Sequence, residues 1–219
     1  ISYPSGLCET FAYDGDVCRM ESITHTGEKR GRKDVFNVMG WLISTEDADG
    51  NVINYEYYSD GLVKSAQIGD DENTKISVSY DNNRNKKSLS DPNYGTMRYE
   101  YDALGNVKKI TNPQNNTIEF QYDILGRLLI RKERDPELNM ENVVKVLYDE
   151  RRGRNGLIKE VLSDNHSVRY AYDDNLRLIN TVETINGEEY ETSYTYDAAD
   201  RVSTICYPSG VSVSKRYSN

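Results

Sequence analysis

The sequence predicts an all-β protein in which tandem antiparallel β-hairpins form one long, curved sheet. Three observations carry this prediction: a Tyr-Asp pair recurs along the chain, alternating apolar and polar residues precede each pair, and turn-forming residues follow it. Helices are not expected, because no window combines sustained helical spacing of apolar residues with capping residues. The stretch from Pro136 to Val146 comes nearest, and there we expect an extended hairpin.

The Tyr-Asp pair returns at a nearly constant interval, which is typical of a repeat protein. Weaker copies in the same phase are Phe36-Asn37, Tyr58-Ser59 and Tyr217-Ser218, and the steps between copies run from 21 (101→122) to 26 (122→148). We therefore expect a single array over residues 1–219, with about ten repeats of roughly 21 to 26 residues. The repeat residues that we single out are Tyr13, Asp14, Tyr80, Asp81, Tyr101, Asp102, Gly105, Tyr122, Asp123, Gly126, Tyr148, Asp149, Tyr172, Asp173, Tyr196 and Asp197.

The two ends of the sequence repeat each other. Ile1–Gly6 and Ile205–Gly210 differ at one position in six, so the sequence starts and stops at the same point of its repeat. We therefore expect a fragment of a longer array, and we expect its open sheet edges to associate with one another.

Each repeat begins with a strand and a tight turn. In stretches such as Tyr99-Glu100-Tyr101, aromatic residues alternate with polar ones, which predicts a strand with one buried face. The following Asp-x-x-Gly predicts a turn, because the carboxylate of Asp102 can accept backbone N–H groups and Gly105 can adopt a positive φ. The Tyr-Asp pair should mark the point where a strand ends and the chain reverses.

A second strand and a second turn complete the repeat. The apolar residues of Val107–Ile110 stand three apart, which strict alternation does not predict; a bulge or burial of both faces could explain the spacing. The second turn is rich in Pro, Gly, Asn and Asp, as in Asn112–Asn115. Two strands in each repeat give roughly twenty short strands.

Composition argues against several classes of protein. The net charge of −9 disfavours a duplex nucleic-acid binder, because phosphate binding needs clustered cations. No stretch is apolar for the roughly 18 residues that span a bilayer, so membrane insertion is not expected. Three cysteines make no disulfide scaffold; we expect mostly buried free thiols, with a Cys8–Cys18 bridge as the alternative.

Catalytic and metal-binding patterns are weak. His25, in a basic loop over Thr24–Lys33, and His166, in an expected turn, are expected at the surface. Asp47–Asn51 looks like a calcium loop but lacks the glutamate that completes one. The turn carboxylates recur once in each repeat, which favours turn capping over acid/base chemistry. We expect no enzyme, no cofactor and no metal site, and a deep pocket with convergent polar groups would reopen the question.

Stretches such as Tyr101–Val107 (Tyr-Asp-Ala-Leu-Gly-Asn-Val) and Tyr122–Leu128 (Tyr-Asp-Ile-Leu-Gly-Arg-Leu) closely resemble the YD repeats of Rhs proteins. That family includes bacterial polymorphic toxins, the BC component of insecticidal toxin complexes, and the teneurins of animal cell surfaces. The resemblance implies a sheet that spirals into a hollow shell, which in the toxins encloses an effector. The Asp91-Pro92 and Asp135-Pro136 pairs do not fit the self-cleavage motif that typically ends such shells, so we expect shell wall alone.

The expected function is therefore a non-catalytic, structural shell segment of a secreted or cell-surface protein. Its partners would be flanking repeats and an enclosed effector domain. The alternative is an adhesion module that presents a sheet face to carbohydrate or to another protein. Glycan binding that depends on exposed tyrosines would favour that alternative.

Overall fold

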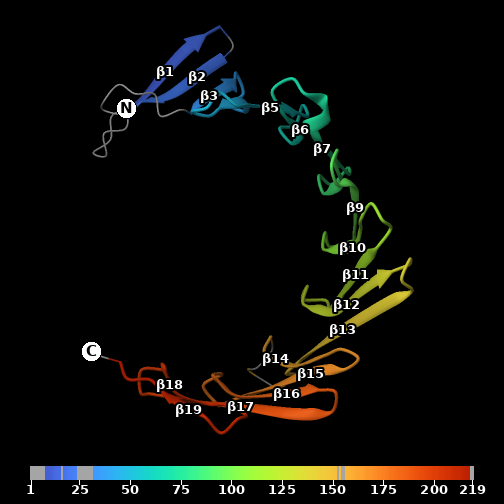
Figure 1. Cartoon of the computed structure of the whole chain (residues 1–219), viewed down its shortest axis with the longest axis vertical. Coiled ribbons are helices and arrows are strands. Elements are labelled where there is room, and N and C mark those ends of the chain that lie inside the picture. Colours follow the sequence, from blue (N-terminus) through green and yellow to red (C-terminus); the bar gives the residue numbers. More distant parts are fainter. Residues whose placement is uncertain (1–7, 16, 24–31, 152, 154–155, 218–219) are drawn as a thin grey trace. The chain divides into compact units, whose positions relative to one another are not determined.

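The computed structural model describes residues 8–15, 17–23, 32–151, 153 and 156–217. The all-β prediction is confirmed: the described strands form an antiparallel sheet of 19 strands, built from consecutive hairpins (Figure 1). Within the described ranges, the one helical element is the short 3-10 helix η1 (Glu72–Thr74). The chain divides into two compact units, Ile1–Glu100 and Tyr101–Asn219, and each is described by itself.

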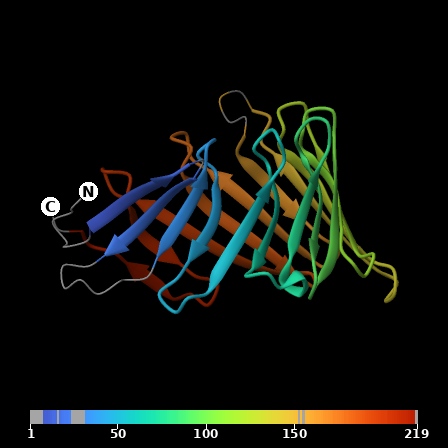
Figure 2. The ribbon, with the colours of Figure 1, turned by 90° about the horizontal axis from the view of Figure 1, so that it is seen from above.

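In the first unit, each strand pairs antiparallel with the strand that follows it in sequence. The successive colours of Figure 2 follow this order along the unit. The strands are β1 (Cys8–Asp14), β2 (Val17–Ile23), β3 (Lys33–Asn37), β4 (Leu42–Glu46), β5 (Val52–Tyr57), β6 (Val63–Ile68), β7 (Ile76–Tyr80), β8 (Lys86–Asp91) and β9 (Gly95–Tyr101).

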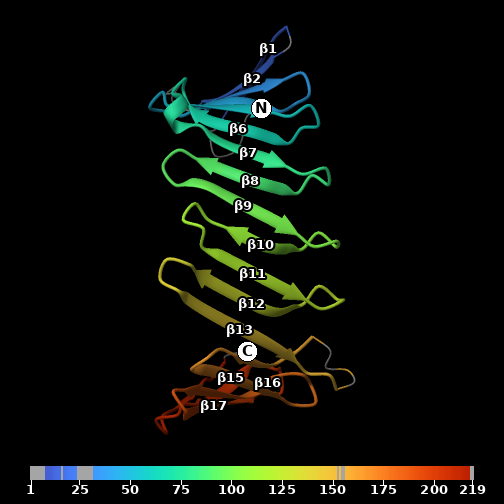
Figure 3. The same cartoon turned by 90° about the vertical axis from the view of Figure 1, so that its right-hand side faces the viewer.

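The second unit repeats the same plan, and Figure 3 shows its strands β10 to β13 side by side. Because neighbouring strands run antiparallel, every second turn lies at the same end of the strands. The strands are β10 (Val107–Thr111), β11 (Thr117–Tyr122), β12 (Leu128–Asp135), β13 (Met140–Tyr148), β14 (Ile158–Leu162), β15 (His166–Tyr172), β16 (Leu178–Ile185), β17 (Glu188–Tyr196), β18 (Val202–Cys206) and β19 (Ser212–Ser214).

The Tyr-Asp pair marks the end of a strand, as the sequence predicts. β11 ends at Tyr122, β15 at Tyr172 and β17 at Tyr196, and the aspartate that follows each tyrosine begins the turn. The Tyr-Asp turns therefore share one end of the strands. The second turns share the other end.

A β-bulge explains the apolar spacing of the second strands. Tyr196 pairs with Val202 and Thr195 pairs with Thr204, so Ser203 is an extra residue without a partner across the ladder. The same shift occurs beside Phe36, Tyr57, Tyr80, Tyr122, Tyr148 and Tyr172. Of the two explanations that the sequence left open, the structure shows the bulge.

The sheet has little core of its own. Among the described residues, Val146 is the one apolar side chain that is buried, and the repeat tyrosines from Tyr57 to Tyr196 are half-buried. Tyr13 is 79% exposed. The sequence predicts strands with one buried face, and the structure shows the tyrosines of that face half-buried, because a single layer of strands buries its side chains only against neighbours on the same face.

Several local expectations can also be judged. Pro136–Val146 does extend a hairpin, between β12 and β13. Lys33 opens β3, and His166 opens β15 with an exposed side chain, so placing them in a loop and a turn was wrong. His25 and the rest of the basic loop lie outside the described residues. Cys18 and Cys206 are free thiols that are half-buried and not fully buried, and the side chain of Cys8 lies outside the description.

Candidate functional site

The recurring feature of the chain is the turn at each Tyr-Asp pair, and the turn at Asp102 shows its geometry. The Gly105 N–H donates to the Asp102 carbonyl at 3.1 Å, and the Asp102 N–H donates to the Asn106 carbonyl at 2.9 Å. Gly105 has φ 86°, a left-handed conformation that glycine adopts without steric cost. This is the three-residue hairpin loop in which a tight turn is followed by one left-handed residue.

The aspartate side chain holds the turn from inside. The Asp102 Oδ1 atom accepts the N–H groups of Leu104 and Asn106, both at 2.9 Å, and Oδ2 accepts the Asn106 side-chain amide at 3.0 Å. The hydrogen bond from the Asn106 side chain, helped by the backbone N–H groups, holds the pKa of Asp102 below its ordinary value. The turn therefore favours the charged carboxylate.

The same side-chain cap recurs in both units. Asp47, in the stretch that resembles a calcium loop, accepts the N–H groups of Asp49 and Asn51, each at 2.9 Å. Asn37 caps its turn through its amide oxygen, so the cap does not require a negative charge. Equivalent caps are made by Asp81, Asp123, Asp173 and Asp197.

In three turns of the second unit, an arginine follows the turn and binds the capping carboxylate. The Nε atom of Arg127 donates to Asp123 Oδ2 at 2.6 Å. The matching distances are 2.7 Å for Arg177 with Asp173 and 2.8 Å for Arg201 with Asp197. Each guanidinium is thereby held in a fixed orientation.

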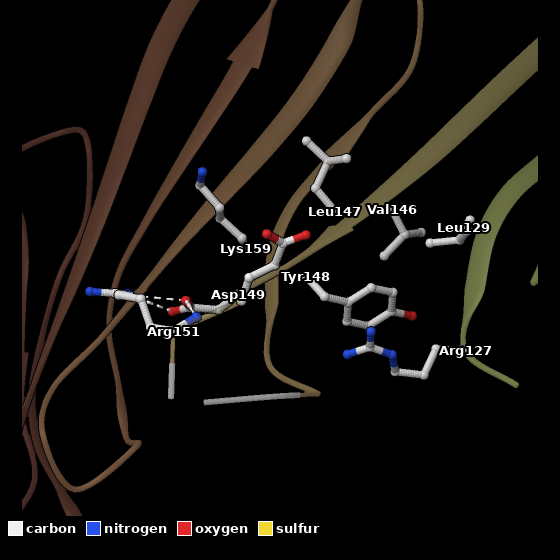
Figure 4. Close-up of a pocket in the computed structure, with 9 residues that line it drawn as sticks. Arg127, Leu129, Val146, Leu147, Tyr148, Asp149, Arg151 and Lys159 are labelled. Carbon is white, nitrogen blue, oxygen red and sulfur yellow. Dashed lines mark hydrogen bonds and ion pairs between the residues drawn. The ribbon is translucent and has the colours of Figure 1, made fainter. Parts of the chain in front are cut away.

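The same arginines reach the repeat tyrosine of the next repeat, which ends a strand at Tyr148 and Tyr196 and follows β19 at Tyr217. The guanidinium carbons of Arg127, Arg177 and Arg201 lie 4.3, 4.7 and 4.4 Å from the ring centroids of Tyr148, Tyr196 and Tyr217, within the range of cation–π attraction. Figure 4 shows Arg127 stacked on the ring of Tyr148. We call this arrangement of aspartate, arginine and tyrosine the clasp.

The tyrosine hydroxyl completes the link between repeats. Tyr148 donates to the Leu128 carbonyl at 3.1 Å and Tyr196 donates to the Leu178 carbonyl at 2.7 Å, so each reaches back across a hairpin. The same bond is made by Tyr57, Tyr122, Tyr172 and Tyr217. Burial raises the pKa of Tyr57, Tyr122, Tyr172 and Tyr196, which keeps these hydroxyls protonated as donors.

One turn in the first unit has the arrangement of a clasp, with an asparagine in place of the aspartate and a tryptophan in place of the arginine. Trp41 occupies the position after the Asn37 turn, and its ring centroid lies 5.4 Å from that of Tyr57. The Tyr57 hydroxyl donates to the Leu42 carbonyl at 2.7 Å, as in the arginine clasps. A flat side chain packed on the next tyrosine is therefore the shared element.

The turn at Asp149 is stretched and borders an open hollow of about 740 Å³ (Figure 4). The Asp149 N–H donates to the distant Leu157 carbonyl at 2.8 Å. Asp149 is 5% exposed, and its carboxylate receives Arg151 through Nε at 2.9 Å and Nη2 at 2.5 Å. The hollow is also lined by Arg127, Leu129, Val146, Leu147, Tyr148, Glu150 and Lys159.

The structure places the predicted repeat residues as follows. The pairs from Tyr80-Asp81 to Tyr196-Asp197 each end a strand and begin a turn, and Gly105 and Gly126 hold positive φ angles. Tyr13 lies near the end of β1 and is exposed, and the side chain of Asp14 lies outside the description. Within the described ranges, no three His, Cys, Asp or Glu residues come together in a way that could hold a metal ion.

Sequence reasoning missed the arginines. Arg127, Arg177 and Arg201 each stand five residues after a repeat tyrosine, and this spacing was a signal that could have found them. Their contact with the tyrosine one repeat later was not visible, because it depends on how consecutive hairpins pair.

None of the described helices is long and apolar enough to cross a membrane.

Comparison with known proteins confirms the resemblance to the Rhs repeat family. Residues 101–137 and 172–212 match the family model described as RHS Repeat. No curated protein matched the chain. Crystal structures of TcdB2-TccC3 superpose with a TM-score of 0.75 at 13% identity over 92% of this chain. The Tc holotoxin pore of Photorhabdus luminescens superposes with a TM-score of 0.72 at 14% identity over the same share.

These solved structures are much longer than this chain, which spans 12% of their length. At such low identity the likeness concerns the fold. The chain thus shares its fold with a stretch of those structures.

Proposed function

We propose that this chain is a non-catalytic wall segment of a β-sheet shell that encloses another domain of a longer, secreted or surface-exposed protein. The observation that carries the proposal is the clasp. In the second unit, three stacks of an arginine on a tyrosine join one repeat to the next: Arg127–Tyr148, Arg177–Tyr196 and Arg201–Tyr217. The hydroxyls of the same tyrosines join these repeats again, through hydrogen bonds to backbone carbonyls.

Two further observations support a wall. The sheet is a single layer with few buried side chains, so both of its faces are left largely uncovered. Each added hairpin makes the sheet wider. Among the residues singled out in the repeat, five aspartates cap turns and four tyrosines bond across a hairpin, which supports a structural role for them: Asp81, Asp102, Asp123, Asp173 and Asp197, and Tyr122, Tyr148, Tyr172 and Tyr196. The resemblance to Rhs repeats is the reason why we propose a shell with an enclosed effector as the partner, and the fold likeness to TcdB2-TccC3 is consistent with it.

Limited proteolysis of the full-length parent protein tests this function. If the wall encloses a domain, a non-specific protease should leave that domain intact in the native protein and digest it once the wall is unfolded with urea. Digestion of the downstream domain at the same rate in both states would contradict the proposal.

Adhesion is the second candidate, and exposed tyrosines favour it. Tyr13 is 79% exposed, and Tyr190 and Tyr207 are 39% and 43% exposed, so aromatic rings are available to sugars or to a partner protein. Binding on a glycan array that is lost on changing Tyr190 and Tyr207 to alanine would support adhesion; an array without binding would leave the wall as the function. Self-association through open edges remains a proposal that light scattering at high protein concentration would test.

A further inference from the structure

One turn of the first unit has the backbone of a clasp but not its side chains. In the turn Tyr58–Leu62, the Gly61 N–H donates to the Tyr58 carbonyl at 3.0 Å and the Tyr58 N–H donates to the Leu62 carbonyl at 2.8 Å. These are the two bonds of the Asp123 turn. By position, Tyr58 replaces the capping aspartate and Leu62 replaces the arginine.

A hollow of about 320 Å³ opens beside the tyrosine that such an arginine would cover. That tyrosine is Tyr80, one repeat later, and the hollow is lined by Tyr58, Ser59, Asp60, Leu62, Tyr80 and Asp81. Tyr58 meets Tyr80 edge to face, with ring centroids 5.9 Å apart, and its hydroxyl donates to the Val78 carbonyl at 3.1 Å. Two rings therefore border a space whose lining residues include no cationic side chain.

The hydroxyl of Tyr80 also differs from that of its counterparts. Six other repeat tyrosines donate to a carbonyl of the preceding hairpin. In the part of the chain that the structure describes, the Tyr80 hydroxyl makes no such bond. Burial, with smaller effects of Tyr58 and Asp60, raises the pKa of Tyr80, so this donor stays protonated at neutral pH.

The lining is acidic as well as aromatic. The side chain of Asp60 is 44% exposed and forms an ion pair with Arg84, whose Nε lies 3.7 Å from Asp60 Oδ2 and whose Nη2 donates to the Asp60 carbonyl at 3.3 Å. Asp81 borders the same hollow, where its carboxylate caps the following turn. A cationic group that entered would meet π faces and carboxylates together.

We propose that this hollow, the Tyr80 seat, binds an arginine side chain presented by a partner protein. Three clasps of the same chain supply the precedent, since each places a guanidinium 4.3 to 4.7 Å from the matching tyrosine and on a carboxylate. A guanidinium is planar and donates in a fork, so it stacks on a ring while bonding Asp60; an ammonium cannot do both. The seat adds a binding site to the wall and does not depend on the wall enclosing a domain.

Trp41 provides a built-in reporter for the test. A methyl group placed on Gly61 would stand 3.0 Å from Trp41 Cζ2, so the indole lies against the turn that borders the seat. Trp41 is the sole tryptophan in the sequence. Titration of the 219-residue chain with acetyl-Gly-Arg-Gly-amide should give a saturable change in tryptophan fluorescence, with a dissociation constant on the order of a millimolar.

Two peptide controls separate the chemistry. The matching lysine peptide should bind several-fold more weakly, and the citrulline peptide, which is planar but uncharged, should give no saturable change. Equal responses to the arginine and citrulline peptides would overturn the proposal.

Leu62→Arg places the missing guanidinium in the chain itself. We expect it to fill the seat and to weaken binding of the arginine peptide at least tenfold, while Leu125→Arg, which adds the same charge at an exposed turn, leaves binding unchanged. Binding by Leu62→Arg equal to that of the unmodified chain would overturn the proposal. If circular dichroism shows that Leu62→Arg does not fold, Asp60→Asn is the deciding variant. It removes the negative charge but keeps the side-chain oxygen that accepts the Leu62 N–H. Unchanged affinity of Asp60→Asn for the arginine peptide would overturn the proposal.

Discussion

At the scale of single residues, the turns differ in how well the side chain suits the backbone. The last turn position is left-handed in every clasp turn; Gly126 fills it with φ 76°, but Leu176 fills it with φ 65°. A left-handed conformation costs a residue with a Cβ roughly 1 to 2 kcal/mol. The Asp173 turn therefore holds strain that the Asp123 turn does not.

We predict that Leu176→Gly stabilises the protein by about 1 kcal/mol, because relief of the left-handed strain exceeds the extra flexibility that glycine brings to the unfolded chain. Urea unfolding followed by circular dichroism measures the effect. Leu125→Gly is the matched control: Leu125 is also exposed but has no positive φ, so the change should destabilise by about 0.5 to 1 kcal/mol. Equal effects of the two substitutions would show that backbone strain is not the cause.

The charged carboxylates of the turn aspartates predict that the stability of the fold depends on pH. The pKa of Asp102 lies below its ordinary value because of the Asn106 side chain, and that of Asp197 because of the Arg201 backbone and side chain. The folded state thus binds fewer protons than the unfolded state as the pH falls through about 3.8, the ordinary value. The stability that these carboxylates add is present above that pH and is lost as the pH falls through the folded pKa.

Urea midpoints measured at pH 7, 4 and 2.5 should therefore fall with pH. Asp102→Asn retains the cap, as Asn37 shows, and should make the acid loss shallower. If the urea midpoint of Asp102→Asn falls with pH as steeply as that of the unmodified chain, the Asp102 carboxylate does not contribute to the loss of stability in acid.

At the scale of elements, consecutive hairpins are joined by contacts between distant residues. Arg127 and Tyr148 illustrate this, with the arginine 29% exposed and its guanidinium 4.3 Å from the ring. A double-mutant cycle with Arg127→Gln and Tyr148→Leu should give a coupling of about 0.5 to 1 kcal/mol. Urea unfolding of the four proteins measures it, and additive effects would mean that the stack does not bind one hairpin to the next.

The sequence predicted the elements better than the contacts between them. Alternation before Tyr122 and the turn chemistry of Asp123 and Gly126 are local, so the strand end and the reversal could be inferred directly. The bulge at Ser203 remained one of two options, because apolar spacing alone does not distinguish it from burial on both faces. The partnership of Arg127 with Tyr148 depends on hairpin pairing, which no local pattern determines.

At the scale of the whole molecule, a sheet of one layer must be held together within its own plane. Val146 is the single buried apolar side chain among the described residues, so a hydrophobic core of the usual kind is not the main support. The links are backbone ladders, side-chain stacks and tyrosine hydroxyls that reach back across a hairpin. Such a sheet is suited to a wall, whose stability depends on nearest neighbours.

Hydrogen–deuterium exchange of the Tyr196→Leu variant tests this lateral support most directly. Tyr196 ends β17 but its hydroxyl bonds the Leu178 carbonyl at the start of β16. We predict faster exchange both in the turn that follows Tyr196 and in the turn Asp173–Arg177 of the preceding repeat. Tyr190→Leu, whose hydroxyl bonds Glu188 of its own strand, should leave the preceding turn unchanged. Faster exchange confined to the Tyr196 turn would contradict the account.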